Sequence, residues 1–161
     1  MVLARRPATE ADIPACLAVY AAARRFMAAS GNPGQWGSSW PPAALVAEDV
    51  FAGRLWVTEE GGRVCGCFAV CLGDEPSYAS IDGEWLDASP YVTLHRVASD
   101  GSARGVLAAA VEQARSENPH VRVDTHRDNA PMLRALAAQG LSPRGTVTVH
   151  DGTERLAFEL A

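Results

Sequence analysis

The sequence contains no lysine, because all 14 of its basic residues are arginine. This absence excludes enzymes that form a Schiff base with a lysine amine, among them the lysine-dependent aldolases and ordinary pyridoxal-phosphate enzymes. It also excludes the Walker-type phosphate loop, which needs a lysine. Alanine, glycine, proline and arginine are all frequent, as in proteins of GC-rich genomes, so we attribute the absence to genomic drift rather than to selection.

Long apolar runs are also missing, since none approaches the roughly 20 residues of a membrane-spanning helix. Residues 1–9 hold two arginines and no apolar signal-peptide core, so we expect a cytoplasmic protein without membrane contact. A net charge of −5 disfavours a broad phosphate-binding face, and no nucleic-acid partner is expected. With 161 residues, 48% of them hydrophobic, the chain is expected to fold as one globular domain over residues 1–161.

Cysteine is scarce, with four residues in the chain. Cys65, Cys67 and Cys71 occupy odd positions of one predicted strand and therefore share a face. We interpret them as small core residues beneath a helix, in preference to a zinc site or a disulfide framework. No metal is expected.

Hydrophobic periodicity predicts alternating strands and helices without repeats or a linker. The predicted strands cover residues 2–6, 55–58, 64–72, 91–98, 121–125, 146–149 and 155–160, and the predicted helices cover residues 10–29, 41–53, 102–117 and 129–139. Residues 73–90 form a long loop, which in a compact domain is usually functional or disordered. The fold class is therefore α/β, with a mixed, mostly antiparallel sheet of about seven strands, four helices and one right-handed parallel crossover over residues 91–125.

The turn after the strand at 91–98 has the composition of an anion site. Gly101 and Gly105 let backbone amides converge at the positive end of the following helix, and Arg104 adds a charged contact. The same composition is also typical of an ordinary helix start.

The order of elements and this turn resemble the GCN5-related N-acetyltransferases, the GNAT family, over nearly the whole chain. Further matching positions are Asn129, Met132, Leu133, Gly140 and Leu141. The family's turn reads Gln/Arg-x-x-Gly-x-Gly/Ala, and here Gly105 fills the middle glycine, with Ser102 and Leu107 in place of the usual Gln/Arg and small residue. The resemblance implies the acyl-CoA N-acyltransferase fold, with acetyl-coenzyme A (acetyl-CoA) as the acyl donor.

The resemblance also implies which residues hold the coenzyme. Backbone groups of Val97 and Ser99 would bond the pantetheine arm where two parallel strands splay apart. Asn129 would face the coenzyme, or act as a plain helix N-cap. The full implied set is Val97, Ala98, Ser99, Ser102, Ala103, Arg104, Gly105, Val106 and Asn129.

His95 stands on the strand where the family often has a glutamate base, and an imidazole, with an ordinary pKa of about 6.5, suits removal of a proton from an ammonium. The alternative is a buried histidine bonded to backbone or to Asp124. Arg122, Asp124 and His126 share one strand face, and Asp124 is expected to orient His95 or His126, or to bind the cation of the substrate. The predicted catalytic residues are His95, Asp124 and His126.

The family's usual catalytic tyrosine falls on Leu136, which cannot donate a proton. Water, Tyr78, Tyr91 or His126 could replace it, or the thiolate could leave without an acid. Candidate substrate-binding residues are the aromatic side chains Trp36, Tyr78, Trp85 and Tyr91, which could instead be apolar plugs that fix their loops. His120 and His150 are expected to be solvated.

These observations predict an N-acetyltransferase that moves acetyl directly from acetyl-CoA to an amine of a small molecule or peptide, acting alone or as a homodimer. Two other interpretations stay open. One is a non-catalytic module that binds or senses acyl-CoA, favoured by Leu136 and the altered turn. The other is a metal-dependent hydrolase that uses His95, Asp124 and His126.

Overall fold

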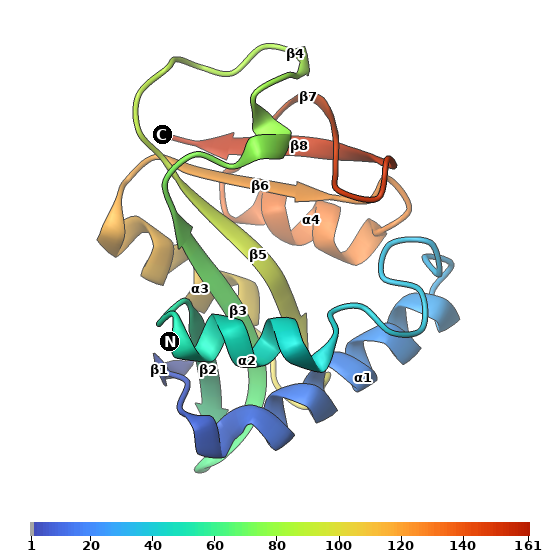
Figure 1. The fold of residues 1–161 in the computed structure, drawn as a ribbon, viewed down its shortest axis with the longest axis vertical. Helices are drawn as coiled ribbons and strands as arrows, with labels where there is room; N and C mark the ends of the chain where they lie inside the picture. The colour runs from blue at the N-terminus through green and yellow to red at the C-terminus, as the bar shows by residue number, and fades with distance from the viewer. Residues whose placement is uncertain (1) are drawn as a thin grey trace.

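The structure, a computed structural model in which residues 2–161 are described, is built on one mixed sheet of eight strands in the order β1-β2-β3-β5-β6-β8-β7-β4 (Figure 1). The strands are β1 (Ala4–Pro7), β2 (Leu55–Glu60), β3 (Arg63–Leu72), β4 (Asp82–Gly83), β5 (Val92–Ser99), β6 (Val121–Thr125), β7 (Ser142–Thr148) and β8 (Glu154–Leu160). The helices are α1 (Ile13–Ala29), α2 (Ala43–Phe51), α3 (Val106–Glu117) and α4 (Ala130–Ala138), with short 3-10 turns η1 (Glu10–Asp12) and η2 (Pro76–Tyr78). The predicted fold class is confirmed.

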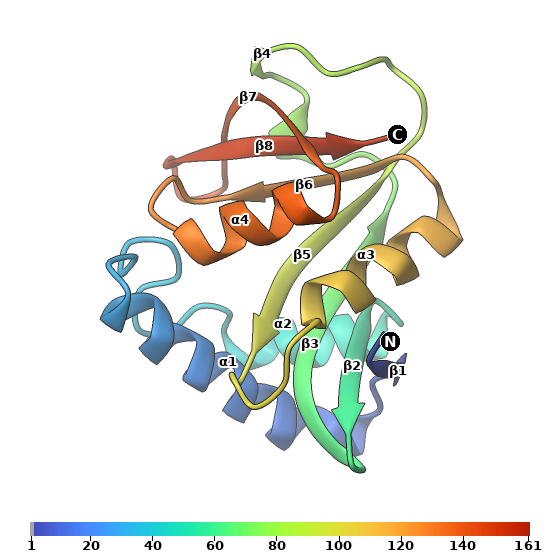
Figure 2. The same ribbon diagram turned by 180° about the vertical axis from the view of Figure 1, so that it is seen from behind.

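The helices form two layers, one on each face of the sheet. Figure 1 shows α1 and α2 in front of the sheet, and Figure 2 shows α3 and α4 on the other side. Between the sheet and α3 and α4 lies a core that includes Phe68, Leu94 and Leu136, while Tyr20, Val46 and Leu55 belong to the core beneath α1 and α2. None of the helices in residues 2–161 has the length and apolar character needed to cross a membrane.

The cysteines are free, as expected, and three of the four are fully buried. Cys16 of α1 and Cys67 of β3 belong to the core beneath α1 and α2, and Cys71 packs against it. The interpretation of these cysteines as small core residues is confirmed.

Close packing on the other face of β3 fixes the start of α3, because a Cβ on Gly66 would lie 2.6 Å from the Val106 side chain.

Strands β5 and β6 are the parallel pair of the predicted crossover, and they separate after three residues. Their register runs from Val92 opposite Val121 to Leu94 opposite Val123 and then ends. On its other edge β5 contains a bulge, because it advances from His95 to Ala98 while β3 advances only from Ala69 to Cys67. A bulge bends a strand, and β5 turns away from β6, as Figure 1 shows.

Two differences from the predicted elements lie near the C-terminal end of the sheet. Strand β4 lies within the predicted loop at 73–90 and pairs Gly83 with Gly145. Strand β7 begins at Ser142, earlier than the predicted residue 146, and its pairing with β8 is irregular between Pro143 and Gly145. Proline and glycine are poor strand formers that are tolerated at bulges, so periodicity could not reveal these segments.

Candidate functional site

A cleft of about 460 Å³ lies where β5 and β6 separate. The sheet contributes His95 from β5, Asp124 from β6 and Arg155 from β8. These side chains share the face opposite α3 and α4, because their strand neighbours Leu94, Val123 and Leu156 pack into the core on the α3 and α4 side. Loop residues close the remaining sides of the cleft: Gln35, Trp36, Trp40, Glu75, Ser77, Val149 and His150.

His95 is paired with Glu75 in this cleft. The His95 Nε2 and Glu75 Oε2 atoms are 2.8 Å apart, and both side chains are about one-fifth exposed, at 22% each. The hydrogen bond from His95, opposed by the effect of burial, lowers the pKa of Glu75 to about 2. Glu75 is therefore an anion near neutral pH, and it holds one imidazole nitrogen in a fixed direction.

Glu75 is itself fixed by the loop that carries it. Its backbone N–H donates to the Tyr91 hydroxyl at 2.8 Å, and its Oε1 accepts from the Ser77 backbone N–H at 3.2 Å. Tyr91 is buried, at 9% exposure, and lies outside the cleft. Tyr91 therefore supports the His95–Glu75 pair from outside the cleft, which differs from the substrate contact predicted for it.

Asp124 accepts a hydrogen bond from the Tyr78 hydroxyl at 2.7 Å. Burial, and then the neighbouring Asp124 carboxylate, raise the pKa of Tyr78 well above its ordinary value. The expectation that Asp124 orients His95 is therefore wrong, because Glu75 occupies that role and Asp124 bonds a tyrosine. Asp124 still lines the cleft, so it faces any ligand bound there.

The predicted catalytic His126 stands apart from this group. It follows the last residue of β6, its Nδ1 accepts from the Asp128 backbone N–H at 3.0 Å, and it does not line the cleft. In residues 2–161, no three side chains among His, Cys, Asp and Glu come together in a way that could hold a metal ion. The geometry therefore does not support the alternative of a metal site on His95, Asp124 and His126.

Arg96, next to His95, adopts an unusual backbone conformation with φ of 51°. Non-glycine residues rarely take positive φ, and such strain is often found at functional sites. The conformation is held because the Arg96 guanidinium donates to both oxygens of the fully buried Asp49, at 2.7 and 3.0 Å, and its carbonyl accepts from the Tyr20 hydroxyl at 2.9 Å. This clamp fixes the bulge that opens the cleft.

The residues implied for the coenzyme lie along the open side of β5 and the start of α3. From His95 to Ser99, β5 has no pairing with β6, so its backbone groups on that side have no partner strand. Gly105 precedes α3 with φ of 98°, and no side chain caps the first helical amides. Such free amides at a helix N-terminus favour an anion. Ser102 Oγ, by contrast, is engaged within the turn by Asp100, at 2.6 Å.

Asn129 acts as the N-cap of α4, as its alternative interpretation predicted. Its side-chain oxygen accepts from the Met132 N–H at 3.2 Å, and its side-chain nitrogen donates to Gln35 Oε1 at 2.9 Å. Leu136, in the position of the family's tyrosine, is fully buried in the core. It cannot reach the cleft as a proton donor.

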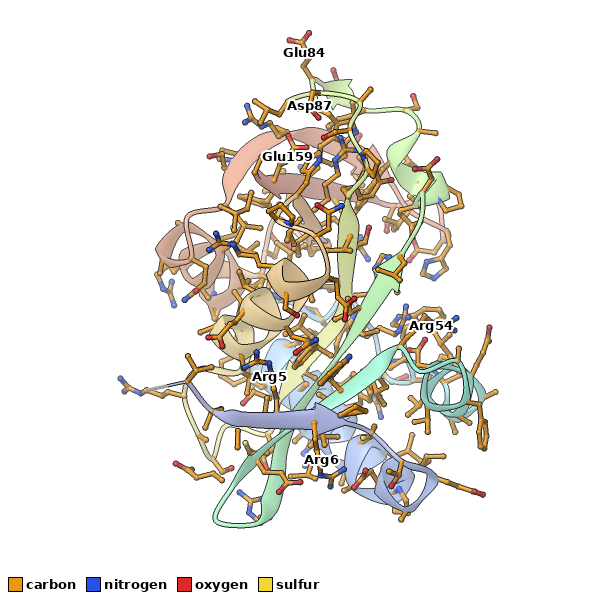
Figure 3. The ribbon with its side chains drawn as sticks, turned by 90° about the vertical axis from the view of Figure 1, so that its left-hand side faces the viewer. Arg5, Arg6, Arg54, Glu84, Asp87 and Glu159 are labelled. Atoms are coloured by element: carbon orange, nitrogen blue, oxygen red, sulfur yellow. The ribbon has the colours of Figure 1, made fainter. Side chains whose placement is uncertain are left out.

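The four aromatic side chains predicted to bind the substrate lie in two different parts of the structure. Trp36 lines the cleft, while Tyr78 and Trp85 of the loop at 73–90 pack with Tyr91 outside it, as the alternative interpretation as apolar plugs describes. We call this second place the capped region, defined by Tyr78, Trp85, Tyr91, His120, Arg122 and Glu159. Figure 3 shows Glu159 beside Asp87 of this loop, at the end of the molecule away from Arg5 and Arg6.

The two histidines predicted to be solvated are in contact with other side chains. His120 is buried, at 5% exposure, and its Nε2 bonds the Glu159 carboxylate. His150 lines the cleft and stacks on Trp40 with ring centroids 4.4 Å apart. The expectation is wrong for His120, because the sequence pattern does not give the path of its loop, and it is confirmed for His150, which is exposed although it lines the cleft.

Sequence reasoning missed Glu75, Asp49, Arg96 and Arg155 as residues of this site. Glu75 lay in a loop without periodicity, and Arg96 resembled any strand residue. A weak signal existed for Arg155, since an arginine among the apolar residues of a predicted strand, with its neighbours Leu156 and Phe158, is unusual.

Comparison with known proteins identifies relatives among solved structures. No protein-family model and no curated protein matches the sequence. An acetyltransferase of the GNAT family from Streptococcus agalactiae 2603 is 30% identical, with 98% of this chain and 94% of that chain covered and a TM-score of 0.86. A ribosomal-protein-alanine N-acetyltransferase from Brucella melitensis is 23% identical, with 98% of each chain covered and a TM-score of 0.64. The Salmonella typhimurium protein yncA, solved with its cofactor acetyl-CoA, is 19% identical, with 99% and 94% covered and a TM-score of 0.62.

Proposed function

The chain belongs to the GNAT family of acetyltransferases, and from this premise we propose that it transfers acetyl from acetyl-CoA directly to an amine of a small molecule or peptide. One observation carries the proposal: the fixed His95–Glu75 pair faces a cleft at the point where β5 loses its partner strand. The site thus combines a base with unpaired backbone beside it. The Salmonella relative solved with acetyl-CoA and the Brucella relative named an N-acetyltransferase support the choice of donor and of amine acceptor.

The residues present fit acetyl-CoA. The free edge of β5 at Val97 and Ser99 suits the amide groups of a pantetheine arm, and the uncapped amides after Gly105 suit its pyrophosphate. Arg104, exposed at the same turn, adds positive charge, and because the chain has no lysine, phosphate contacts fall to arginine and backbone. Bound acetyl-CoA supplies an activated thioester whose acetyl group an amine can take.

His95 acts as the base in this proposal. Because Nε2 donates to the anionic Glu75, the proton sits on Nε2 and Nδ1 keeps a free lone pair. Nδ1, directly or through a water, takes one proton from the ammonium of the acceptor, and the neutral amine then bonds the acetyl carbon as the carbon–sulfur bond breaks. The second nitrogen proton passes through solvent to the departing thiolate. An ammonium has no lone pair and cannot attack the thioester, so the reaction needs a base to remove the first proton.

The other parts of the reaction need little from side chains. A backbone amide near Val97 holds the carbonyl oxygen as negative charge develops on it. The thiolate is a good leaving group and needs no acid, which agrees with Leu136 in the position of the family's tyrosine. Trp36 and Trp40 also line the cleft, and in this proposal they contact the acceptor.

Coenzyme binding and turnover test the proposal separately. We expect acetyl-CoA and coenzyme A to raise the melting temperature, and an amine panel to release free thiol from acetyl-CoA. We also expect Gly105→Val to weaken coenzyme binding about tenfold or more, because a φ of 98° strains a β-branched residue by roughly 1–3 kcal/mol. Binding without thiol release from any amine would favour the non-catalytic sensor, and no binding of either coenzyme would contradict both functions.

A further inference from the structure

Arg155 is a buried cation of the cleft that has no carboxylate partner. It is 5% exposed, and it lines the cleft from β8. Its guanidinium donates to the Thr153 hydroxyl at 2.6 Å and to the carbonyls of Glu154 and Gln35 at 3.0 and 3.1 Å. These acceptors are neutral, and within residues 2–161 Arg155 forms no ion pair. Asp151 connects to it through the Thr153 hydroxyl.

The other arginines of the cleft differ in this respect. Arg96 and Arg54 both bind Asp49, which is fully buried, with Nε–Oδ distances of 2.7 and 2.9 Å. Arg54 also pairs with Glu48 at 3.5 Å, so two carboxylates within the chain compensate the two positive charges. Arg155 is the cleft-lining arginine that forms no ion pair among the described residues, since Asp151 reaches it only through the Thr153 hydroxyl.

Burying a charge without a partner costs several kcal/mol in stability, unless an opposite charge compensates it. A guanidinium also presents a planar fork of N–H donors that matches a carboxylate. Since Arg155 lines the cleft, a bound ligand can provide that carboxylate. The cost of leaving the cation unpaired is then recovered on binding.

We propose that the acceptor carries a carboxylate as well as the reactive amine, as a free amino acid does, and that Arg155 binds this carboxylate. The proposal rests on the function proposed above and names its substrate class. The charges of the cleft agree with it, because Glu75 and Asp124 attract the ammonium while Arg155 lies two residues along β8 from Ala157, the pairing partner of Asp124. The cleft volume of about 460 Å³ suits a small zwitterion.

Matched ligands test the proposal on the wild-type protein. Each common amino acid is compared with its carboxamide, which keeps the side chain and the amine but lacks the negative charge. Thiol release from acetyl-CoA gives kcat/KM, and tryptophan fluorescence, reported by Trp36 and Trp40 in the cleft, gives binding without turnover. We expect the best amino acids to exceed their amides by about 10- to 100-fold in both measurements. Equal values for acid and amide, or no binding of either, would overturn the proposal.

Variants of Arg155 locate the effect. Arg155→Gln is expected to abolish the preference for the acid, and Arg155→Lys, which keeps the charge without the fork, to retain part of it. Arg115→Gln, an exposed site on α3 beyond the other face of the sheet, is the control and should keep the full preference. If Arg155→Gln does not fold, the reduced preference of Arg155→Lys decides the question. A full preference in folded Arg155→Gln, or in Arg155→Lys, would overturn the role of Arg155.

The outcomes separate this inference from the proposed function. Thiol release with equal rates for acids and amides leaves the acetyltransferase standing and removes the carboxylate site. Preferred binding of acids without any thiol release leaves the carboxylate site standing and contradicts the acetyltransferase.

Discussion

The capped region and the cleft each hold a buried arginine on the same face of the sheet, but only the arginine of the capped region is paired with a carboxylate. Arg122 of β6 is 4% exposed and Arg155 of β8 is 5% exposed. Arg122 binds the buried Glu159 at 2.9 Å and lies between the rings of Trp85 and Tyr91, 4.0 Å from each centroid. Arg155 has neutral oxygens around it and an open cleft in front.

This difference separates a structural charge from a functional one. In the capped region the Glu159 carboxylate also accepts from His120 and from the Leu86 backbone N–H. Burial opposes these bonds, but together with the bond from Arg122 they lower the pKa of Glu159. Equal burial therefore does not imply an equal role. The partners of a buried charge indicate whether it stabilises the fold or is left for a ligand.

The largest expected effect is on the stability of the capped region. Glu159→Gln removes the anion that compensates Arg122, and breaking a buried pair in this way costs about 3–5 kcal/mol. We expect the free energy of unfolding, measured by urea denaturation at neutral pH, to fall by that amount. Glu154→Gln, which breaks the exposed pair with Arg127, should change it little. A small loss in Glu159→Gln would show that the capped region is not held by this charge.

A substitution in the cleft should have the reverse pattern. His95→Ala is expected to lower kcat about 100- to 10,000-fold, the usual contribution of a general base, and to remove the acidic limb of the pH–rate profile. The free energy of unfolding should change far less than in Glu159→Gln, because His95 is partly exposed. Steady-state thiol release, measured from about pH 5 to about pH 9, gives kcat and the pH–rate profile. Urea denaturation gives the free energy of unfolding. An unchanged profile would exclude His95 as the base.

A smaller effect is expected from the residue that positions His95. Glu75→Gln should lower kcat/KM by about tenfold, because the imidazole loses the carboxylate that fixes its orientation. Cys65→Ala, a buried site outside the cleft, serves as a control for handling and folding. A loss of activity matched by an equal loss of folded protein would mean that Glu75 acts on the fold alone.

The same variant has a predicted dependence of stability on pH. The pKa of Glu75 is lowered from 4.5 to about 2 in the folded chain, so its ionised form stabilises the fold. This contribution to stability is complete when the pH is above the pKa of Glu75 in the unfolded chain. It is lost as the pH falls toward the lower pKa of Glu75 in the folded chain. The stability difference between wild type and Glu75→Gln should therefore shrink between about pH 5 and about pH 3. A stability difference that does not change with pH would show that the His95–Glu75 pair does not stabilise the fold.

The sequence predicted the fold where hydrophobic periodicity was strong. The parallel crossover of β5, α3 and β6 and the helix at Ala130–Ala138 follow from apolar spacing and capping residues. Strand β4 and the start of β7 could not be predicted, because Gly83, Pro143 and Gly145 carry no periodic signal and are positioned by pairing across the sheet.

The site was predictable in part for the same reason. His95 and Asp124 lie on strands, so their shared face follows from alternation. Their partners come from the loop at 73–90, and no local pattern states that Glu75 reaches His95 or that Tyr78 reaches Asp124. The difference between Arg122 and Arg155 depends on which groups surround each guanidinium, which only the assembled chain defines.

A crystal structure with coenzyme A bound tests the central claim, that acetyl transfer takes place in the cleft, most directly. We expect the coenzyme sulfur in the gap between β5 and β6 beside His95, the pyrophosphate at the first amides of α3 after Gly105, and a capped region unchanged around Arg122. Coenzyme bound away from the β5 edge, or inserted into the capped region, would exclude acetyl transfer in the cleft.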